Sequence, residues 1–424
     1  MYMLPIVVTP ILTRLYTPES FGEWGIFSSF VSITSIGIFL GLENVIIQAK
    51  EEQLSDIILL CLIISTGIIV IISIVFWGGT IGGISFFKDF PNTYLLAIYL
   101  FLYCLYTIFY NLNNRYEQYY TLSFANIVKG CSQAILRIIL AFLCLHIING
   151  LILGTTIAEG ITALFLFLFL FKTPIMNMKL QFQYKRLKHL LFQYKNFPLY
   201  DAPSSILSFS AFNLPVIILS LYFNKAEIGC FSIILQLLLM PMSLIGSAIG
   251  KVYYQRLSKF NNNANDTNIA THEVLRILVI ISVLPLLFIV CGGDKLIILF
   301  LGNQWQTAGN VAICLALWSF PTILTQPLLP LFRVLNKQRT LLLYDAFYFL
   351  LGVGTIMFFC QFTDNLYLIL TLFSTACFVV KFLLFEKIIT ISQISLKSYI
   401  RILPLWGVAL IVLILRLFFI FEPN

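Results

Sequence analysis

Long apolar runs, separated by short polar stretches, follow one another from the start of the chain to its end. A helix needs about 20 largely apolar residues to cross a bilayer. Runs of that length begin near Phe21, Ile57, Thr93, Leu122, Leu151, Leu199, Ile228, Val274, Val311, Leu341, Leu366 and Ile402. The opening segment Met1–Leu12 is too short to cross unaided, so the pattern predicts twelve full spans and a partial one before them.

The composition supports insertion of these runs into a membrane. Of the 424 residues, 60% are hydrophobic and 10% are charged. Soluble globular domains carry about 45–50% apolar and about 25% charged residues. The nine cysteines lie mostly inside apolar runs, and the three histidines are far apart in the sequence. Because neither residue type shows the spacing of a metal site, we expect no metal and no cofactor.

The basic residues indicate an orientation in the membrane. With the N-terminus in the cytoplasm and the spans alternating, eighteen lysines and arginines fall on the cytoplasmic side. Four fall on the other side, namely Arg14, Lys88, Lys225 and Lys295, and the remaining four, Lys129, Arg137, Lys381 and Arg416, lie within spans. Cytoplasmic loops of membrane proteins carry such an excess, so the net charge of +8 says little about nucleic acid. We expect a multi-pass membrane protein with a cytoplasmic N-terminus.

Two stretches half a chain apart are alike. Leu15–Phe27 (LYTPESFGEWGIF) and Leu221–Ile233 (LYFNKAEIGCFSI) share a Leu-Tyr pair, a short polar turn, a glycine and an apolar run. Two bundles related by an internal repeat are a common plan for transporters. The expected divisions are an N-terminal helical lobe at 1–171, a basic cytoplasmic linker at 172–198, a C-terminal helical lobe at 199–386 and an additional C-terminal transmembrane helix at 387–424.

Four polar residues of the predicted fifth span lie on one helical face. Asn126, Lys129, Gln133 and Arg137 are separated by three, four and four positions. Because an ionised side chain at the bilayer centre costs roughly 2.5–3.5 kcal/mol on insertion scales, we expect this stripe to line a wet cavity and bind an anionic substrate. The alternative is that the long basic stems reach the headgroups, which is easier for Lys129, near the cytoplasmic end, than for Arg137.

Three acidic residues also lie at or near apolar spans. Glu43, Glu159 and Asp201 are candidate sites for a coupling proton or cation, because a carboxyl group in apolar surroundings can exchange a proton near neutral pH. The alternative is an ion pair with Lys129 or Arg137, or a position at the edge of the water.

Other residues could shape the path of a substrate. Pro321, Pro327 and Pro330 interrupt the predicted tenth span, where they would form either a hinge or a static kink. Arg14 ends the first helix on the expected outer side. It could line the mouth of a cleft, anchor at headgroups or pair with an acid of the following turn.

Several stretches resemble bacterial polysaccharide and O-antigen flippases of the multidrug/oligosaccharidyl-lipid/polysaccharide exporter superfamily. They are LPIVVTPILTRLYTPESFGEWGIF near the start, Tyr99–Tyr119, Tyr194–Phe223 and Leu299–Ala312. Family members usually carry some tens of residues before the first stretch, so we expect a truncated first helix or a misassigned start. The resemblance implies an all-α, MATE-like fold of two pseudo-symmetric six-helix bundles in a V, with one extra C-terminal helix.

The same resemblance implies a flippase rather than an enzyme. Its substrate would be a polyprenyl-pyrophosphate-linked oligosaccharide repeat unit, as in O-antigen, lipopolysaccharide or capsule synthesis, carried across the bacterial inner membrane by alternating access. Membrane lipids and the glycan polymerase and chain-length proteins of the same pathway are the implied partners. Two alternatives stay open, a drug or small-molecule exporter of the same superfamily and a membrane glycan polymerase or glycosyltransferase. The short outer loops expected here disfavour the enzyme.

Overall fold

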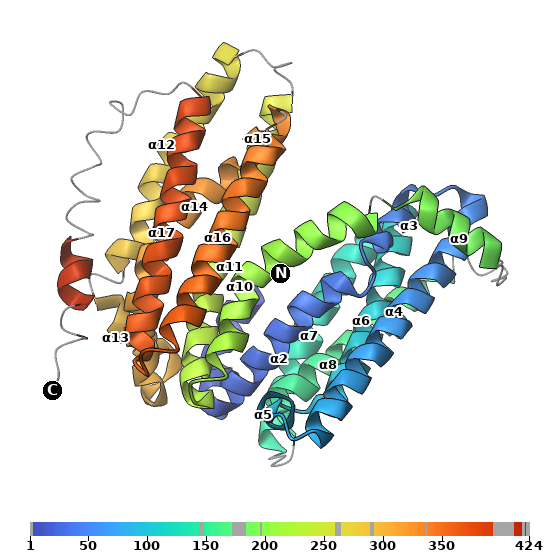
Figure 1. Ribbon diagram of the computed structural model, residues 1–424, viewed down its shortest axis with the longest axis horizontal. Helices are drawn as coiled ribbons and strands as arrows, with labels where there is room; N and C mark the ends of the chain where they lie inside the picture. Colours follow the sequence, from blue (N-terminus) through green and yellow to red (C-terminus); the bar gives the residue numbers. More distant parts are fainter. Residues whose placement is uncertain are drawn as a thin grey trace. The chain divides into compact units, whose positions relative to one another are not determined.

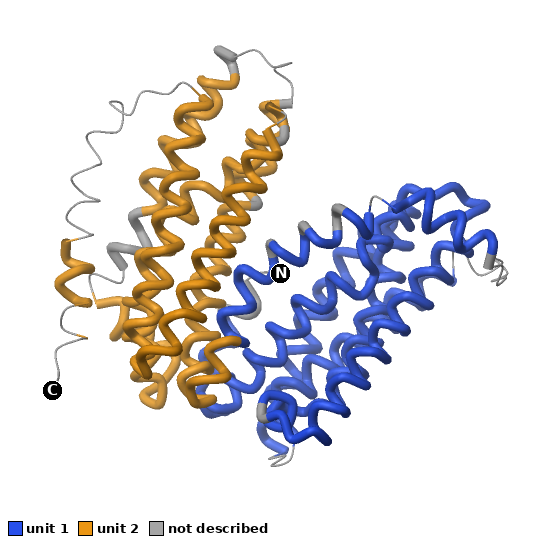
Figure 2. Tube along the Cα trace, in the orientation of Figure 1, with its two compact units in different colours: residues 1–217 blue, residues 218–424 orange. Residues whose placement is uncertain are grey.

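The computed structural model describes residues 3–143, 148–171, 184–195, 197–258, 264–288, 292–335, 337–392, 411–417 and 420. Within this part of the chain every regular element is helical (Figure 1). The chain forms two units, residues 1–217 and residues 218–424, which Figure 2 colours separately. Of the predicted linker, residues 172–183 and 196 lie outside the described part of the chain, and of the predicted span near Ile402 only residues 411–417 and 420 are described.

The first unit is a bundle in which α8 packs against both α6 and α7. Helix α4 packs against α6, and α1 against α7. Its elements are α1 (Met3–Leu15), α2 (Pro18–Gly37), η1 (Leu42–Asn44), α3 (Val45–Gln48), α4 (Glu51–Ile81), α5 (Ser85–Asp89), α6 (Thr93–Arg115), α7 (Tyr119–Phe142), α8 (Gly150–Leu170), α9 (Tyr184–Gln193), η3 (Phe197–Asp201) and most of α10 (Ala202–Leu219).

Local sequence sets both ends of α2. The side chain of Thr17 caps its first turn by accepting a hydrogen bond from the Ser20 amide. Leu40 and Gly41, with φ of 52° and 80°, adopt the left-handed conformation that stops a helix. The path then bends by 61° into η1 and α3, so α2 and its continuation form a broken segment.

The second unit is built around α14, which packs against α11, α12, α13 and α17. Within it the Trp318 indole is fully buried and donates a hydrogen bond of 2.8 Å to the Tyr348 hydroxyl, which satisfies its polar atom. The elements are α11 (Lys225–Ser258), α12 (Ala264–Phe288), α13 (Asp294–Leu301), η5 (Asn303–Trp305), α14 (Gln306–Thr325), η6 (Gln326–Leu328), α15 (Pro330–Val334), α16 (Gln338–Phe359) and α17 (Leu366–Ile391).

Eight helical segments of the described residues are long and apolar enough to cross a membrane. They contain α4, α6, α7, α8, α11, α14, α16 and α17, and α2 with its bent continuation makes a ninth if the two parts cross together. Helix α4 exposes a run of large apolar side chains that includes Val70, Ile71, Ile74 and Trp77. Such a surface is stable in lipid and not in water, and the chain is a multi-pass membrane protein.

Candidate functional site

Helix α7 carries the predicted basic stripe, and its two faces differ in exposure. Arg137 is buried, whereas Asn126, Lys129 and Gln133 are half-buried. The opposite face exposes large apolar side chains, namely Phe124, Ile127, Ile135 and Ile139. In a membrane such a helix turns its apolar face to lipid and its polar face to protein or water. The structure therefore brings the four stripe residues together on the side of α7 that faces away from lipid.

Lys129 lies against both neighbouring helices of the bundle. Its Nζ is 2.9 Å from Oε1 of Glu159 on α8 and 4.1 Å from the ring centroid of Tyr106 on α6. The Glu159 side chain is 0% exposed and that of Lys129 is 25% exposed. Two residues that the sequence analysis assigned to different roles, cation and coupling carboxylate, thus form one ion pair inside the first unit.

Arg137 lies two turns further along the same face. Its Nη2 donates a 2.8 Å hydrogen bond to the Thr155 hydroxyl of α8, and its guanidinium carbon lies 4.8 Å from the centre of the Trp24 ring of α2. The residue is 9% exposed. Its Nε meets no hydrogen-bond partner, and no ion pair among the described residues includes it. Arg137 is therefore a buried cation whose charge no neighbouring carboxylate balances.

Close packing of α7 on α8 depends on a glycine. A Cβ atom at Gly154 would lie 3.0 Å from Cγ of Arg137 and 3.1 Å from its amide nitrogen. Real Cβ atoms rarely approach other atoms so closely, so a larger residue would push the two helices apart. The absence of a side chain at Gly154 keeps Arg137 within reach of Thr155.

Tyr16, which directly follows α1, contacts α7 at Arg137. Its hydroxyl donates a 2.6 Å hydrogen bond to the backbone carbonyl of Arg137. Burial raises the pKa of Tyr16 to about 12, and the nearby charge of Arg137 lowers it by less. The phenol consequently stays protonated at physiological pH and remains a donor.

The other predicted binding and coupling residues lie apart from this group. Arg14 is exposed on α1 and joins none of the ion pairs within the described residues. Glu43 lies in η1, where its backbone carbonyl accepts a 3.0 Å hydrogen bond from Asn111 of α6. Asp201 ends the π-helical turn η3, and its side chain lies outside the described part of the chain.

The candidate hinge prolines Pro321 and Pro327 are buried in the second unit. Pro321 lies inside α14, where a proline removes a backbone donor. The hydroxyl of Thr325 donates a 2.9 Å hydrogen bond to the Pro321 carbonyl. Pro327 lies in the tight turn η6 that separates α14 from α15, and Gly250 of α11 packs on its backbone. The predicted break is present, and whether it bends remains a prediction.

The second unit also buries a lysine, which the sequence analysis counted within a span without assigning it a role. Lys381 of α17 is 8% exposed, and its Nζ lies 4.4 Å from the ring centroid of Tyr348. Asp345 of α16 is its acidic electrostatic partner. In the first unit the lysine is on α7 and the acid on α8, whereas here the acid is on α16 and the lysine on α17. Each of these lysines therefore lies over a tyrosine ring and close to one carboxylate.

Four tyrosines on α6, which the sequence analysis did not single out, follow one another at helical spacing. The centroids of Tyr99 and Tyr103 are 6.4 Å apart, those of Tyr103 and Tyr106 are 6.2 Å apart, and those of Tyr106 and Tyr110 are 5.7 Å apart. Their spacing of four, three and four positions in the sequence was the available signal. We call this row the tyrosine ladder.

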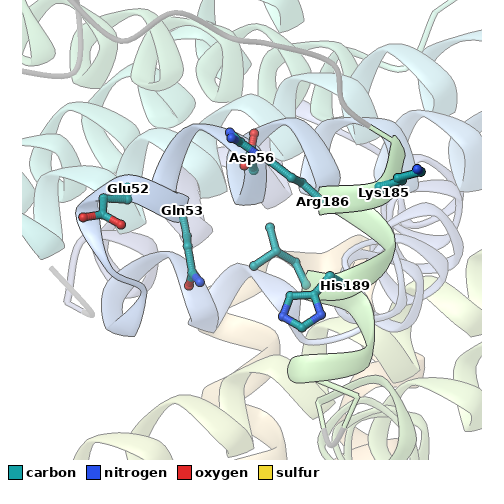
Figure 3. A pocket seen from close by; sticks show the side chains of 7 residues that line it. Glu52, Gln53, Asp56, Lys185, Arg186 and His189 are labelled. Atoms are coloured by element: carbon teal, nitrogen blue, oxygen red, sulfur yellow. The ribbon is translucent and has the colours of Figure 1, made fainter.

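A separate pocket of about 420 Å³ opens where α9 lies on the start of α4 (Figure 3). In this view the Arg186 side chain of α9 extends toward the buried Asp56 of α4. Among the described residues no three His, Cys, Asp or Glu side chains gather as metal ligands would. The pocket is lined by Glu52, Gln53, Asp56, Lys185, Arg186, His189 and Leu190.

Comparison with known proteins gives one family match. The family model described as "Polysaccharide biosynthesis protein" matches residues 11–310. Among curated protein sequences none matches the chain.

Solved structures of transporters share the fold. The chain is similar to an inward-facing multidrug resistance MATE family transporter of the MOP superfamily, with a TM-score of 0.70, 16% identity, and coverage of 93% of this chain and 96% of that one. It is similar to the lipid II flippase MurJ in an inward closed conformation, with a TM-score of 0.66, 16% identity, and coverage of 100% and 87%. A transporter of the same superfamily from Pyrococcus furiosus has a TM-score of 0.54, 14% identity, and coverage of 92% and 94%. These likenesses confirm the predicted all-α, MATE-like fold.

Proposed function

Because the chain belongs to the family of polysaccharide biosynthesis proteins, we propose that it is a flippase for polyprenyl-pyrophosphate-linked oligosaccharide repeat units. The substrate is of the O-antigen or capsule type, and it crosses the bacterial inner membrane by alternating access. The similarity of the fold to that of a flippase for lipid II supports a lipid-linked substrate. No catalytic group takes part in this proposal, because the bonds of the substrate are unchanged by transport.

The observation that carries this proposal is the unbalanced charge of Arg137. A buried cation with no carboxylate partner is expensive in a membrane, so its presence marks a functional site. A guanidinium group matches the geometry of phosphate oxygens and binds them with charge-assisted hydrogen bonds. The unpartnered Nε of Arg137 is a donor that the pyrophosphate of the substrate could use.

Lys129 gives the site a second cation that is already engaged. An arriving pyrophosphate would compete with Glu159 for the Lys129 ammonium, which is the more exposed member of the pair. A Glu159 carboxylate that loses this partner would take up a proton or a small cation, because an isolated buried charge is unstable. Release of that ion would restore the pair and expel the substrate, which makes Glu159 our first coupling candidate.

The remaining predicted residues keep secondary roles in the proposal. Asn126 and Gln133 lie on the polar face of α7, where their amides can bond sugar hydroxyls. Arg14 lines the outward mouth of the path, while Glu43 and Asp201 are alternative coupling sites. Pro321 and Pro327 allow the second unit to bend. The N-terminus is cytoplasmic, and the polymerase and chain-length proteins of the pathway act on the product.

The deciding experiment is complementation of a host strain that lacks the protein. Deletion should cause lipid-linked glycan to accumulate on the inner leaflet and surface glycan to disappear. The native chain and Arg256→Ala, which removes an exposed arginine paired with Glu273, should restore surface glycan. Arg137→Ala should not restore it, although immunoblots show equal protein in the membrane.

Three outcomes would contradict the proposal in different ways. Deletion without accumulation of lipid-linked glycan would overturn the flippase. Drug sensitivity without a glycan defect would favour the drug exporter instead. Normal surface glycan with Arg137→Ala would remove Arg137 from the site.

A further inference from the structure

The tyrosine ladder lies on the side of α6 that faces away from lipid. Large exposed side chains mark the opposite side of this helix, at Tyr94, Ile98 and Phe101. With 100° of rotation per residue, the ladder residues lie about half a turn around the helix from those three. The ladder is therefore distinct from an aromatic belt, which gathers at the two membrane interfaces.

The ladder runs into the polar site on α7. The Lys129 ammonium lies 4.1 Å from the centre of the Tyr106 ring, so the ladder and the basic stripe share one side of the first unit. The Tyr103 hydroxyl lies near Ser35 of α2. From Tyr103 to Tyr110 the helix rises about 10 Å, which exceeds the length of a single sugar ring.

The exposure of the rings suits a ligand that lies along them. Tyr99 is buried against Phe27 of α2, with ring centroids 5.8 Å apart, and closes one end of the ladder. Tyr103, Tyr106 and Tyr110 are each half-buried. The hydroxyls of Tyr106 and Tyr110 meet no hydrogen-bond partner among the described residues. These three tyrosines thus offer part of their ring surface, and Tyr106 and Tyr110 also offer their hydroxyl groups.

Sugars are the ligands that match this chemistry. The face of an aromatic ring carries a negative quadrupole, and it attracts the slightly positive C–H bonds on the flat side of a pyranose. The phenol hydroxyls can bond the hydroxyl groups at the edges of the sugar. A lipid chain or an apolar drug would gain nothing from the hydroxyls, and a phosphate would be repelled by the ring faces.

We propose that three members of the tyrosine ladder, Tyr103, Tyr106 and Tyr110, form the binding track for the oligosaccharide part of the substrate, next to the cations that bind its pyrophosphate. This inference rests on the proposed flippase function and adds a separate site for the sugars. Stacking on the tyrosine rings tolerates different sugars, because the contact is with the flat face of the sugar ring and not with individual hydroxyl groups. The track therefore favours saccharides as a class over one particular saccharide.

The test measures binding of two probes to the purified full chain in nanodiscs. One probe is the undecaprenyl-pyrophosphate-linked glycan extracted from host cells that lack the protein, and the other is undecaprenyl pyrophosphate without sugar. The native chain should bind the glycan-bearing probe more tightly. The triple variant Tyr103→Leu, Tyr106→Leu, Tyr110→Leu should lose about tenfold or more of this preference. The triple phenylalanine variant should keep most of it, because the rings remain.

The matched control is Tyr94→Leu, which removes an exposed tyrosine from the opposite face of the same helix and should leave the preference unchanged. If the triple leucine variant does not fold, Tyr103→Leu and Tyr110→Leu are measured singly, with an expected loss of about threefold each. An unchanged preference for the glycan-bearing probe in the leucine variants overturns the proposal that the ladder binds sugars, but it leaves the proposed flippase function standing. Failure of the native chain to bind either probe overturns the flippase and the ladder with it.

Discussion

The ammonium of Lys129 on α7 pairs with the carboxylate of Glu159 on α8 at 2.9 Å, and the two partners differ in their access to water. Glu159 is fully shielded, and its second oxygen has no hydrogen-bond partner among the described residues. Lys129 remains partly exposed. Loss of the lysine would thus leave the buried Glu159 carboxylate without a partner. Loss of the acid would leave the Lys129 ammonium, which can still reach water.

We predict that Lys129→Met is more damaging than Glu159→Gln. Removal of one partner from a buried ion pair costs about 3–5 kcal/mol of stability. Lys129→Met should reach that range, because it leaves the fully shielded Glu159 carboxylate without its partner. The double variant should recover much of the loss, because two neutral side chains need no partner. Melting temperatures of the purified proteins in detergent provide the measurement. Losses that simply add in the double variant would show that the pair contributes nothing to stability.

Arg137→Lys separates charge from shape at the candidate site. Lysine keeps the positive charge but lacks the planar fork that contacts both Thr155 and Trp24. We expect an intermediate level of surface glycan, between the native chain and Arg137→Ala, at equal protein abundance. Arg256→Lys serves as the exposed control. Full activity of Arg137→Lys would mean that charge alone is needed there.

Gly154→Ala should destabilise the protein, although alanine is the better helix former. Its new methyl group would meet the backbone of Arg137, and overpacking of this kind costs about 1–3 kcal/mol. Gly67→Ala on α4 is the matched control, because nothing lies within 4 Å of the added atom. That variant should be neutral or up to about 1 kcal/mol more stable. Equal melting temperatures for the two variants would argue against tight packing of α7 on α8.

Tyr16→Phe should lower the free energy of unfolding by about 0.5–1.5 kcal/mol, because it removes the hydrogen bond to the Arg137 carbonyl. The pKa of Tyr16 is raised to about 12 in the folded protein, so this stabilisation is fully present below pH 10, the ordinary pKa of tyrosine. It should then be lost as the pH rises through about 12.

Melting temperatures at pH 8 and pH 10.5 check this expectation. Native chain and Tyr16→Phe should differ more at pH 8 than at pH 10.5. Tyr120→Phe, at a position that is 91% exposed, provides the control with little effect at either pH. A gap that widens with pH would contradict the donor role of Tyr16.

The length of the apolar runs was enough to predict most of the helices, the family resemblance implied their MATE-like arrangement, and helical periodicity predicted one face of the site. Within the described part of the chain, the apolar runs of spanning length are confirmed as helices, and the stripe from Asn126 to Arg137 shares a face because its spacing follows the helical repeat. The break after α2 was not predicted. It depends on the left-handed backbone of Leu40 and Gly41. Leucine rarely adopts this conformation, so its presence in the sequence does not predict one.

Contacts between helices were much harder to derive. Glu159 and Lys129 were both predicted as site residues, but their pairing was only one alternative, because thirty positions separate them and no local rule relates them. Trp24 and the tyrosine ladder were not singled out, since aromatic residues are common in apolar runs. Their significance follows from which cation each ring faces, and that depends on contacts of Lys129 and Arg137 with residues of α6 and α2.

The polar face of α7 also constrains how the protein is made. This helix has the lowest hydropathy of the eight candidate spans, and its two cations oppose partition into lipid by roughly 2.5–3.5 kcal/mol each. The carboxylate that neutralises Lys129 arrives only with α8, which the ribosome synthesises later. We therefore expect α7 to stay at the translocon until α8 emerges, so that Lys129 enters the bilayer already paired and the two helices insert together as a hairpin.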